Sequence, residues 1–420
     1  MKFIINGGKK LGGEIFVSGS KNAATPIIAA TLLVETPCIL SHIPRIGDVM
    51  SMLDILKSIG SKQRWIDEHT IEIINDEIQP ENLDQTLVAK IRSSILVIGP
   101  LLARFGKVEI VMPGGCLIGS RPIDAHSEAF ISLGAEVVYD ADSGKYAITL
   151  KKPQAQTVIL RERSVTGTEN ILMFGALHPL TIKLAAEEPH VEDLGRFLEK
   201  LGVQITGLGT HTITTNPTTE MSTGNVAHTI VYDAIEMGTF AVLAAATKSD
   251  VVIHNVTVNH LDAVLGKLSE MGVSFSIDGN TLTVQGKKSQ LTAAKIEARL
   301  YPGIPSDLQA LFGVLATQAN GTSLIFDTLY EGRLRYIDEL KKMGADVTML
   351  DPHRALITGP SVLHGTEVTS LDLRAGATLV IATLIADGQS ILGNAEQIDR
   401  GYENIDERLR ALGADIKRLD

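Results

Sequence analysis

The chain has 420 residues, 44% of them hydrophobic, and carries a formal net charge of −11. This length exceeds one ordinary core and predicts two or three domains, and the apolar content excludes a disordered chain. The excess of acidic side chains argues against a nucleic-acid partner, because nucleic-acid binding depends on neutralising phosphates. A small anionic ligand is compatible with this charge, since arginines can cluster locally in an acidic protein.

The sequence also argues against a membrane partner. It contains no apolar run of roughly 18 residues, the length that a membrane-spanning helix needs. Residues 1–6 lack the apolar length and cleavage site of a signal peptide, so we expect a cytoplasmic protein. Two cysteines, Cys38 and Cys116, are too few for a disulfide framework. Cys38 lies in an apolar stretch and is expected to be a small buried hydrophobe.

A pair formed by Leu, Met or Ile and a following Gly ends six amphipathic helix patterns along the chain. Successive glycines lie 68 to 74 residues apart, which predicts six copies of one structural unit. Each glycine suits the left-handed backbone position just after a helix. In chain order they are Gly60, Gly134, Gly202, Gly272, Gly344 and Gly413.

Each unit also holds a second helix pattern, upstream of the first and almost uncharged. A helix that is apolar on all sides is buried on all sides, so we expect these helices at the centre. They span residues 23–33, 95–103, 168–176, 239–246, 308–317 and 377–385, of which 168–176 fits least cleanly.

Together these patterns predict an α/β fold with helices inside and sheets outside. Each unit would run strand, buried helix, strand, amphipathic helix and strand pair, and six units would form two inside-out α/β barrels of three repeats of about 70 residues. We expect one lobe from residues 1–21 and 232–420 and a second from 22–231, with the active site between them. An ordinary layered α/β protein with coincidental spacing is the alternative.

A glycine-rich loop surrounds the second cysteine. Three glycines fall within residues 114–119, which predicts a mobile loop with an approachable backbone. Cys116 lies in this loop, where Arg121 or His126 can lower the pKa of the thiol. The pattern fits a nucleophile or a proton donor, and a surface turn with an inert cysteine is the alternative.

Basic residues recur at equivalent places in the repeat. Helix N-termini attract phosphate and carboxylate, and arginine adds bidentate donors. Each basic residue alone is more often a solvated surface charge, but their recurrence favours one shared anion site. They are Lys21, which precedes Asn22, with Arg92 and Arg374 at buried-helix starts, and Arg333 and Arg400 in strand-to-helix loops.

Asp307 stands at the start of the buried helix 308–317, where a carboxylate is also a normal helix cap. Spacing alone favours the cap. If Asp307 instead faces the anion site, it is the natural general base. The sequence offers no metal-ligand cluster, so we expect no cofactor, and its patterns define no oligomeric state.

Five motifs in this order resemble the UDP-N-acetylglucosamine 1-carboxyvinyltransferase family of the enolpyruvyl transferase superfamily. The resemblance spans essentially the whole chain and implies the EPSP synthase-like fold of two inside-out barrels, in agreement with the repeat. The motifs are Ser18-Gly19-Ser20-Lys21-Asn22-Ala23-Ala24, the Gly-Gly-Cys116 loop with Arg121-Pro122-Ile123-Asp124, Pro305-Ser306-Asp307-Leu308-Gln309, Asp372-Leu373-Arg374-Ala375 and Asp399-Arg400-Gly401-Tyr402.

The resemblance implies transfer of the enolpyruvyl group of phosphoenolpyruvate to the 3-hydroxyl of UDP-N-acetylglucosamine, the first committed step of peptidoglycan synthesis. Cys116 would protonate the donor's methylene carbon and can form an adduct, Asp307 would take the hydroxyl proton, and Lys21 would complete the catalytic set. The implied phosphoenolpyruvate-binding residues are Lys21, Asn22, Arg92, Arg121, Arg333, Arg374 and Arg400. The implied sugar-nucleotide-binding residues are Asn22, Arg92, Arg121, Pro122, Ile123, Asp124, Ala125, His126, Ser164, Val165, Asp307 and Leu329.

Two positions depart from the family pattern. Ala234 stands where many relatives have arginine, and Gly332 stands where asparagine is common. They support one alternative, a catalytically silent paralogue that binds UDP-sugars. The other alternative is a sister transferase acting on shikimate 3-phosphate, which would not need Cys116.

Overall fold

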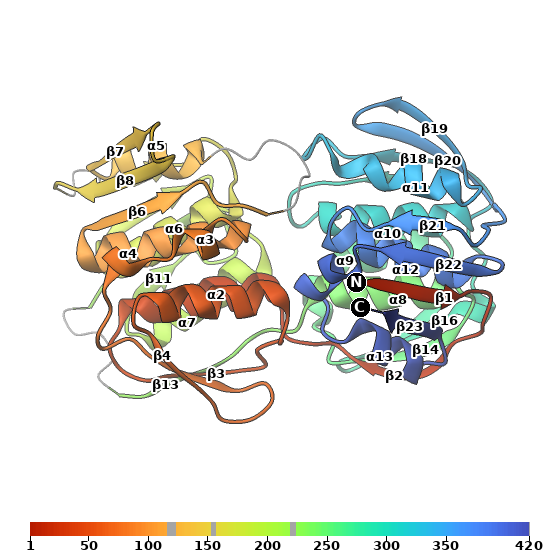
Figure 1. Cartoon of the computed structure of the whole chain (residues 1–420), viewed down its shortest axis with the longest axis horizontal. Coiled ribbons are helices and arrows are strands. Elements are labelled where there is room, and N and C mark those ends of the chain that lie inside the picture. The colour runs from red at the N-terminus through yellow and green to blue at the C-terminus, as the bar shows by residue number, and fades with distance from the viewer. Residues whose placement is uncertain (116–122, 153–156, 219–223, 420) are drawn as a thin grey trace. The chain divides into compact units, whose positions relative to one another are not determined.

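The computed structural model describes residues 1–115, 123–152, 157–218 and 224–419, which form two compact units (Figure 1). Within these residues the first unit holds 1–18 and 232–419, and the second holds 19–115 and 123–231. Each unit has its own continuous apolar core. No helix among the described residues is both long and apolar enough to span a membrane.

Three inner helices form the centre of the first unit and pack against one another. Their Ala, Leu, Val and Ile side chains leave almost no polar face, so nearly every residue is buried. Asp233 and Asp372 cap two of them, each accepting hydrogen bonds from two backbone N–H groups. The inner helices are α8 (Ala234–Ala246), α10 (Ser306–Thr317) and α12 (Leu373–Ile385).

Further helices and three four-stranded sheets surround these inner helices. The amphipathic helices are α9 (Asp262–Glu270), α11 (Tyr336–Lys342) and α13 (Ile405–Ala411), and the 3-10 turns are η4 (Val258–His260), η5 (Gly286–Lys288), η6 (Arg333–Arg335) and η7 (Ala395–Arg400). The strands are β2 (Gly12–Phe16), β14 (Asp250–His254), β15 (Phe275–Asp278) and β16 (Thr281–Gln285); β17 (Lys295–Glu297), β18 (Gly321–Phe326), β19 (Asp346–Asp351) and β20 (Arg354–Gly359); and β1 (Lys2–Asn6), β21 (Glu367–Thr369), β22 (Gln389–Gly393) and β23 (Asp415–Leu419).

The second unit repeats this plan. Its inner helices are α1 (Lys21–Ala30), α4 (Ile98–Phe105) and α6 (Val165–Phe174), extended by η1 (Thr31–Leu33) and η3 (Arg92–Val97). The remaining helices are α2 (Gly47–Ser58), α3 (Gln85–Val88), α5 (Asp124–Ser132), α7 (Pro189–Lys200) and η2 (Pro80–Asn82). The strands are β3 (Cys38–Ser41), β4 (Lys62–Trp65), β5 (Ile71–Ile74) and β13 (Val226–Thr229); β6 (Lys107–Val111), β7 (Ala135–Asp140) and β8 (Lys145–Leu150); and β9 (Thr157–Ile159), β10 (Leu180–Lys183), β11 (Gln204–Thr206) and β12 (Thr212–Asn216).

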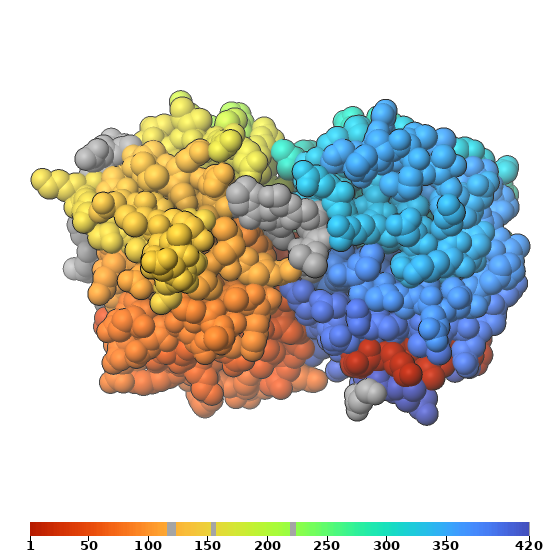
Figure 2. All heavy atoms as spheres, turned by 45° about the horizontal axis from the view of Figure 1, so that its top comes forward, coloured from red at the N-terminus to blue at the C-terminus, as the bar shows by residue number. Residues whose placement is uncertain are grey.

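Strand order shows how the repeat closes. In the sheet β15-β16-β14-β2, an edge strand lies parallel to its neighbour and two antiparallel strands follow. The sheet β21-β22-β1-β23 has the same pattern, with β21 parallel to β22 and antiparallel pairs after it. Its third strand, however, is β1, the first strand of the chain. Figure 2 accordingly shows the red N-terminal residues among the blue C-terminal ones. The predicted α/β fold, with repeats that place helices inside and sheets outside, is confirmed. The N-terminal strand β1 pairs with the C-terminal strands β22 and β23 in one sheet.

The six repeat glycines all adopt positive φ angles, from 78° at Gly272 to 107° at Gly60. Each lies two positions after the last residue of an amphipathic helix, directly after the C-cap residue, as the spacing predicts. A left-handed backbone is costly for residues with a Cβ, so glycine is favoured there. The predicted inner helix 168–176 spans Val165–Phe174 in the structure. Polar Glu169 and Asn170 are buried within it, which is why the apolar pattern in the sequence fits this helix least cleanly.

A glutamine side chain protects the edge of one sheet. Among the described residues, β6-β8-β7 has three strands and lacks the parallel edge strand that the other five sheets contain. The side-chain amide of Gln85 takes that place: its Oε1 accepts from Val111 N at 2.8 Å, and its Nε2 donates to Glu109 O at 3.0 Å. These bonds satisfy backbone groups that an open strand would offer to another chain.

Gly413→Ala should lower the free energy of unfolding by roughly 1–2 kcal/mol, the cost of a left-handed alanine. Its φ is 98°, and an added Cβ would meet only Lys10 O at 3.7 Å, so the change isolates backbone strain. Gly266→Ala is the matched control: Gly266 lies within α9 in open space, and alanine there should stabilise by roughly 0.5–1 kcal/mol. Denaturant unfolding measures both, and equal effects of the two variants would contradict this account.

Candidate functional site

Asp307 is held by two buried arginines at the helix starts of the first unit. It lies in the first turn of α10, while Arg333 begins η6 and Arg374 is the second residue of α12. Asp307 Oδ1 accepts a short hydrogen bond from Arg333 Nη2, and Oδ2 accepts from Arg374 Nε at 3.1 Å. The Asp307 side chain is 31% exposed, whereas the arginine side chains are 5% and 2% exposed. The carboxylate therefore faces outward with its supporting charges behind it.

This geometry bears on the interpretation of Asp307 as a helix cap. The N-cap of α10 is Pro305, and no side chain caps that helix. The interpretation of Asp307 as a helix cap, favoured by spacing alone, is therefore wrong. Its carboxylate accepts from guanidinium groups instead.

Arg374 has two donors without a well-aligned acceptor. Its Nη1 and Nη2 atoms are buried and make no hydrogen bond of good geometry among the described residues, although the Tyr402 side chain is close enough for a weak hydrogen bond. The guanidinium lies 5.2 Å from the centre of the Tyr402 ring. Burial alone would lower the pKa of Arg374, but the attraction of Tyr402, Asp307 and Asp233 raises it, so the side chain stays charged. A buried cation with unsatisfied donors suits an anion that presents two oxygens.

Glycine at position 401 leaves room beside this arginine. A Cβ there would lie 2.6 Å from Leu373 Cδ1 and 3.7 Å from Arg374 Nη1. Arg400, directly before it, ends η7 in the same unit and donates from Nη1 to Gln397 Oε1 at 3.1 Å. The Arg400-Gly401-Tyr402 motif thus packs at the start of α12, beside Arg374.

Arg333 is also surrounded by acidic groups. Burial alone would lower its pKa, but Asp307, Asp372 and Asp327 outweigh this and raise it. Its Nε donates to Ser306 Oγ at 3.0 Å, and Asp372 Oδ1 lies 3.8 Å from Nη1. Its guanidinium is therefore fixed on more than one side.

The second unit places basic residues at the starts of its inner helices, as the sequence predicts. Lys21 is the first residue of α1 and Arg92 the first of η3, with Asn22 half-buried beside Lys21. Lys21 Nζ lies 3.3 Å from Oδ2 of buried Asp48. Buried Glu169 on α6 has its pKa raised by burial and by Glu188, while Lys21 opposes that shift.

His126 is a buried neutral histidine. Asn170 Nδ2 can only donate, so Nδ1 of His126 accepts this bond at 3.0 Å, and Nε2 lies 3.1 Å from Thr166 Oγ1. Burial, assisted by Arg92, lowers the pKa of His126 to about 3. A neutral imidazole supplies no positive charge, so of the two groups expected to lower the pKa of the Cys116 thiol, this geometry favours Arg121 over His126.

Other predicted sugar-nucleotide residues lie on several elements. Asp124 begins α5 and its side chain is 60% exposed, while its neighbours Ile123 and Ala125 are buried. Ser164 caps α6 by accepting from Gly167 N at 3.2 Å, and Val165 is the first residue of that helix. Leu329 donates its backbone N–H to Asp327 Oδ1 at 2.9 Å.

Cys116, Arg121 and Pro122 lie outside the described residues. The other cysteine, Cys38, is buried, and burial raises the pKa of its thiol to about 12. Cys38 is therefore a protonated, inert side chain at neutral pH, as its apolar neighbours predict.

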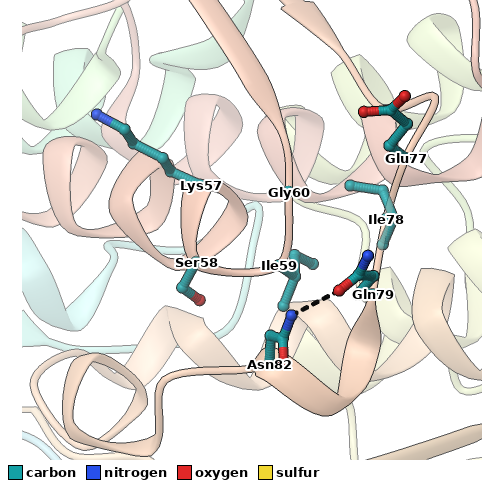
Figure 3. A pocket seen from close by; sticks show the side chains of 8 residues that line it. All are labelled: Lys57, Ser58, Ile59, Gly60, Glu77, Ile78, Gln79 and Asn82. Carbon is teal, nitrogen blue, oxygen red and sulfur yellow. Dashed lines mark hydrogen bonds between the residues drawn. The ribbon is translucent and has the colours of Figure 1, made fainter.

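A separate hollow of about 640 Å³ lies in the second unit (Figure 3). It contains none of the predicted site residues, and its walls come from the end of α2 and the segment before and within η2. Across its floor Asn82 Nδ2 donates to Gln79 Oε1 at 2.8 Å. Its lining residues are Lys57, Ser58, Ile59, Gly60, Glu77, Ile78, Gln79 and Asn82.

Sequence reasoning missed several residues that support the site. Asp48 and Glu169 lie near Lys21, and Asp327 lies behind Arg333. The sequence could have indicated Tyr402, because it directly follows Arg400-Gly401 in a motif of the site. Asp48 and Glu169 carried no such signal, since Lys21 is distant from both along the chain, and Asp327 stands near Arg333 in the sequence but belongs to no motif that marks it.

Comparison with known proteins first defines the class. Residues 5–409 match the model of the EPSP synthase (3-phosphoshikimate 1-carboxyvinyltransferase) family. The enolpyruvyl transferase NikO from Streptomyces tendae superimposes with a TM-score of 0.89 at 24% identity, covering 100% of this chain and 98% of that one. EPSP synthase from Acinetobacter baumannii gives a TM-score of 0.74 at 19% identity, with 99% of both chains covered. These two structures show the shared fold.

Closer relatives then identify the family. UDP-N-acetylglucosamine 1-carboxyvinyltransferase 1 of Carboxydothermus hydrogenoformans is 42% identical, covering 100% of this chain and 98% of the relative. The Coxiella burnetii enzyme named UDP-N-acetylglucosamine 1-carboxyvinyltransferase is 43% identical, covering 100% and 96%. The Treponema denticola enzyme of that name is 40% identical, covering 99% of each chain. The chain belongs to the UDP-N-acetylglucosamine 1-carboxyvinyltransferase family.

His126 should make stability depend on pH. Its folded pKa of about 3 lies below the ordinary value of 6.5, so between these values only the unfolded chain binds the proton. This contribution to stability is complete above about pH 6.5 and is lost as pH falls, by up to about 1.4 kcal/mol per unit. Replacing His126→Asn should therefore shrink the drop in unfolding free energy between pH 7 and pH 5 by about 2 kcal/mol.

Thr166→Val provides the control, because it removes the partner of Nε2 and no titratable group. It should lower stability similarly at both pH values. An NMR titration in which the His126 ring takes up a proton between pH 6 and 7 would contradict the neutral assignment.

Proposed function

We propose that this protein transfers the enolpyruvyl group of phosphoenolpyruvate to the 3-hydroxyl of UDP-N-acetylglucosamine in the cytoplasm and releases phosphate. This is the first committed step of peptidoglycan synthesis. Full-length similarity to enzymes named for this transfer supports it. The structural observation that carries it is the outward-facing Asp307 carboxylate held between Arg333 and Arg374.

The reaction balances as an addition followed by an elimination. In the addition, the sugar oxygen bonds to C2 of the donor while Asp307 takes the hydroxyl proton and Cys116 delivers a proton to the methylene carbon. In the elimination, the Cys116 thiolate takes a proton back from the resulting methyl group, and the bond between C2 and the phosphate oxygen breaks. The double bond is restored and inorganic phosphate leaves.

Arg374 can connect the base to the donor. Its Nε holds Asp307, while Nη1 and Nη2 form the opposite, unsatisfied edge of the same guanidinium. A carboxylate or phosphate of the donor would supply two acceptors to that edge once the site opens to admit it. Competition between the donor and Asp307 for arginine donors would then free an Asp307 lone pair for the sugar hydroxyl.

The remaining roles follow the family pattern. Lys21, Asn22, Arg92, Arg121 and Arg400 would hold the donor's anionic groups with the two arginines of the first unit. Fixed cations of this kind orient the donor and stabilise developing charge. The sugar nucleotide would contact residues 121–126, Ser164, Val165 and Leu329. His126 can take part through its backbone, because protein groups engage both ring nitrogens.

The purified protein should release phosphate only when phosphoenolpyruvate and UDP-N-acetylglucosamine are both present. Shikimate 3-phosphate in place of the sugar nucleotide is the control and should give no release. Turnover with shikimate 3-phosphate would identify the sister transferase. Absence of turnover by correctly folded protein, combined with retained sugar-nucleotide binding, would favour the silent paralogue.

Asp307→Asn should lower kcat by roughly a hundredfold or more, the usual range for loss of a general base. The affinity for UDP-N-acetylglucosamine, measured by calorimetry, should change little, because the amide keeps the shape of the carboxylate. Asp338→Asn is the matched control, since Asp338 occupies the first turn of α11 but is exposed. Near-normal turnover of folded Asp307→Asn protein would remove this residue from the role of base.

A further inference from the structure

Asp327 is a fully buried carboxylate that the proposed reaction does not use. It directly follows β18, and its exposure is 0%. Its backbone is fixed from both directions by His353: Asp327 N donates to His353 O at 2.9 Å, and His353 Nδ1 lies 2.8 Å from Asp327 O. A buried carboxylate is costly unless hydrogen bonds and nearby positive charge compensate it.

The two oxygens of Asp327 reach two different parts of the site. Oδ1 accepts the backbone N–H of Leu329 at 2.9 Å, and Oδ2 accepts the hydroxyl of Ser306 at 2.6 Å. Because the Ser306 hydroxyl donates to Asp327, its lone pair is free to accept from Arg333 Nε at 3.0 Å. Arg333 Nη2 then donates to Asp307.

These bonds form one continuous connection from the Leu329 segment to the proposed base. Ser306 and Asp307 are neighbours at the start of α10, so the relay holds both the backbone and the side-chain partner of the base. The Tyr330 ring, 5.7 Å from the Arg333 guanidinium, closes the same loop over the arginine. The Ser306 carbonyl oxygen, 3.3 Å from Arg333 Nε, is a second acceptor for the same donor.

We propose that Asp327 is a positioning residue that, through Ser306 and Arg333, aligns Asp307 with the acceptor sugar held by the Leu329 segment. The inference rests on the proposed function, in which Asp307 is the base and Leu329 contacts the sugar nucleotide. Asp327 itself touches neither substrate. Its carboxylate sets the direction of the Ser306 hydroxyl, and this direction determines where the Arg333 guanidinium can lie.

Four variants test the relay by steady-state kinetics on folded protein. Asp327→Asn keeps an amide oxygen for Leu329 N–H but presents donor hydrogens to Ser306, so kcat should fall tenfold to a hundredfold with little change in KM for the sugar nucleotide. Ser306→Ala should give a similar fall. The double variant should be no slower than the slower single variant, because both changes break one connection. Asp327→Ala also removes the acceptor for Leu329 and should additionally raise KM for the sugar nucleotide severalfold.

Asp351→Asn is the matched control. Asp351 makes the same local turn, accepting from His353 N at 2.8 Å, but no hydrogen bond joins its side chain to Asp327, Ser306 or Arg333 among the described residues, so its substitution leaves the relay's side-chain bonds in place. Its kcat should stay within twofold of the wild type. Circular dichroism and thermal unfolding define the folded fraction of each variant.

A kcat within twofold of wild type for folded Asp327→Asn, or a double variant slowed by the product of the two single effects, would overturn the inference. If neither Asp327 variant folds, the test depends on Ser306→Ala alone. A kcat within twofold of wild type for this variant would then overturn the inference. The wild type is assayed first. Its failure to turn over would overturn the proposed function together with this inference, whereas a normal wild type with normal variants overturns the inference only.

Discussion

The ion pairs between Asp307 and two buried arginines are the constraint on which the rest of the first unit's site depends. Arg333 and Arg374 are almost inaccessible to solvent, so each needs anionic partners to stay charged in the folded protein. Asp307 supplies part of that compensation while remaining partly exposed itself. The Nη1 and Nη2 atoms of Arg374 are not engaged by Asp307, and in the proposed function they are the donors offered to the anionic substrate.

The fold produces this cluster by bringing helix starts together. Inner helices α8, α10 and α12 have almost no polar face, so their charged residues are confined to their first turns and caps. Asp233, Asp307 and Arg374 all occupy such positions. The same rule places Lys21 and Arg92 at inner-helix starts of the second unit. A repeat built around apolar helices therefore concentrates chemistry at the helix ends.

Much of this could be predicted from the sequence. The repeat glycines and apolar helix patterns define local conformation and burial, which depend on residues close in the chain. The pairing of Asp307 was not predictable from spacing, because Arg374 is 67 residues away along the chain and a first-turn carboxylate is usually a cap. His126 looked like a cation beside a thiol, but its state depends on Asn170 and Thr166, which the fold brings to it. Asp327 carried no sequence signal, because its proposed role depends on Ser306, which lies 21 residues away along the chain.

The most direct test of the central claim is a crystal structure of the protein with UDP-N-acetylglucosamine. The account predicts that the sugar 3-hydroxyl lies within about 2.6–3.2 Å of an Asp307 carboxylate oxygen, with Arg333 still bound to that carboxylate. A sugar nucleotide whose 3-hydroxyl faces a different acidic residue, with Asp307 remote from the sugar, would contradict it.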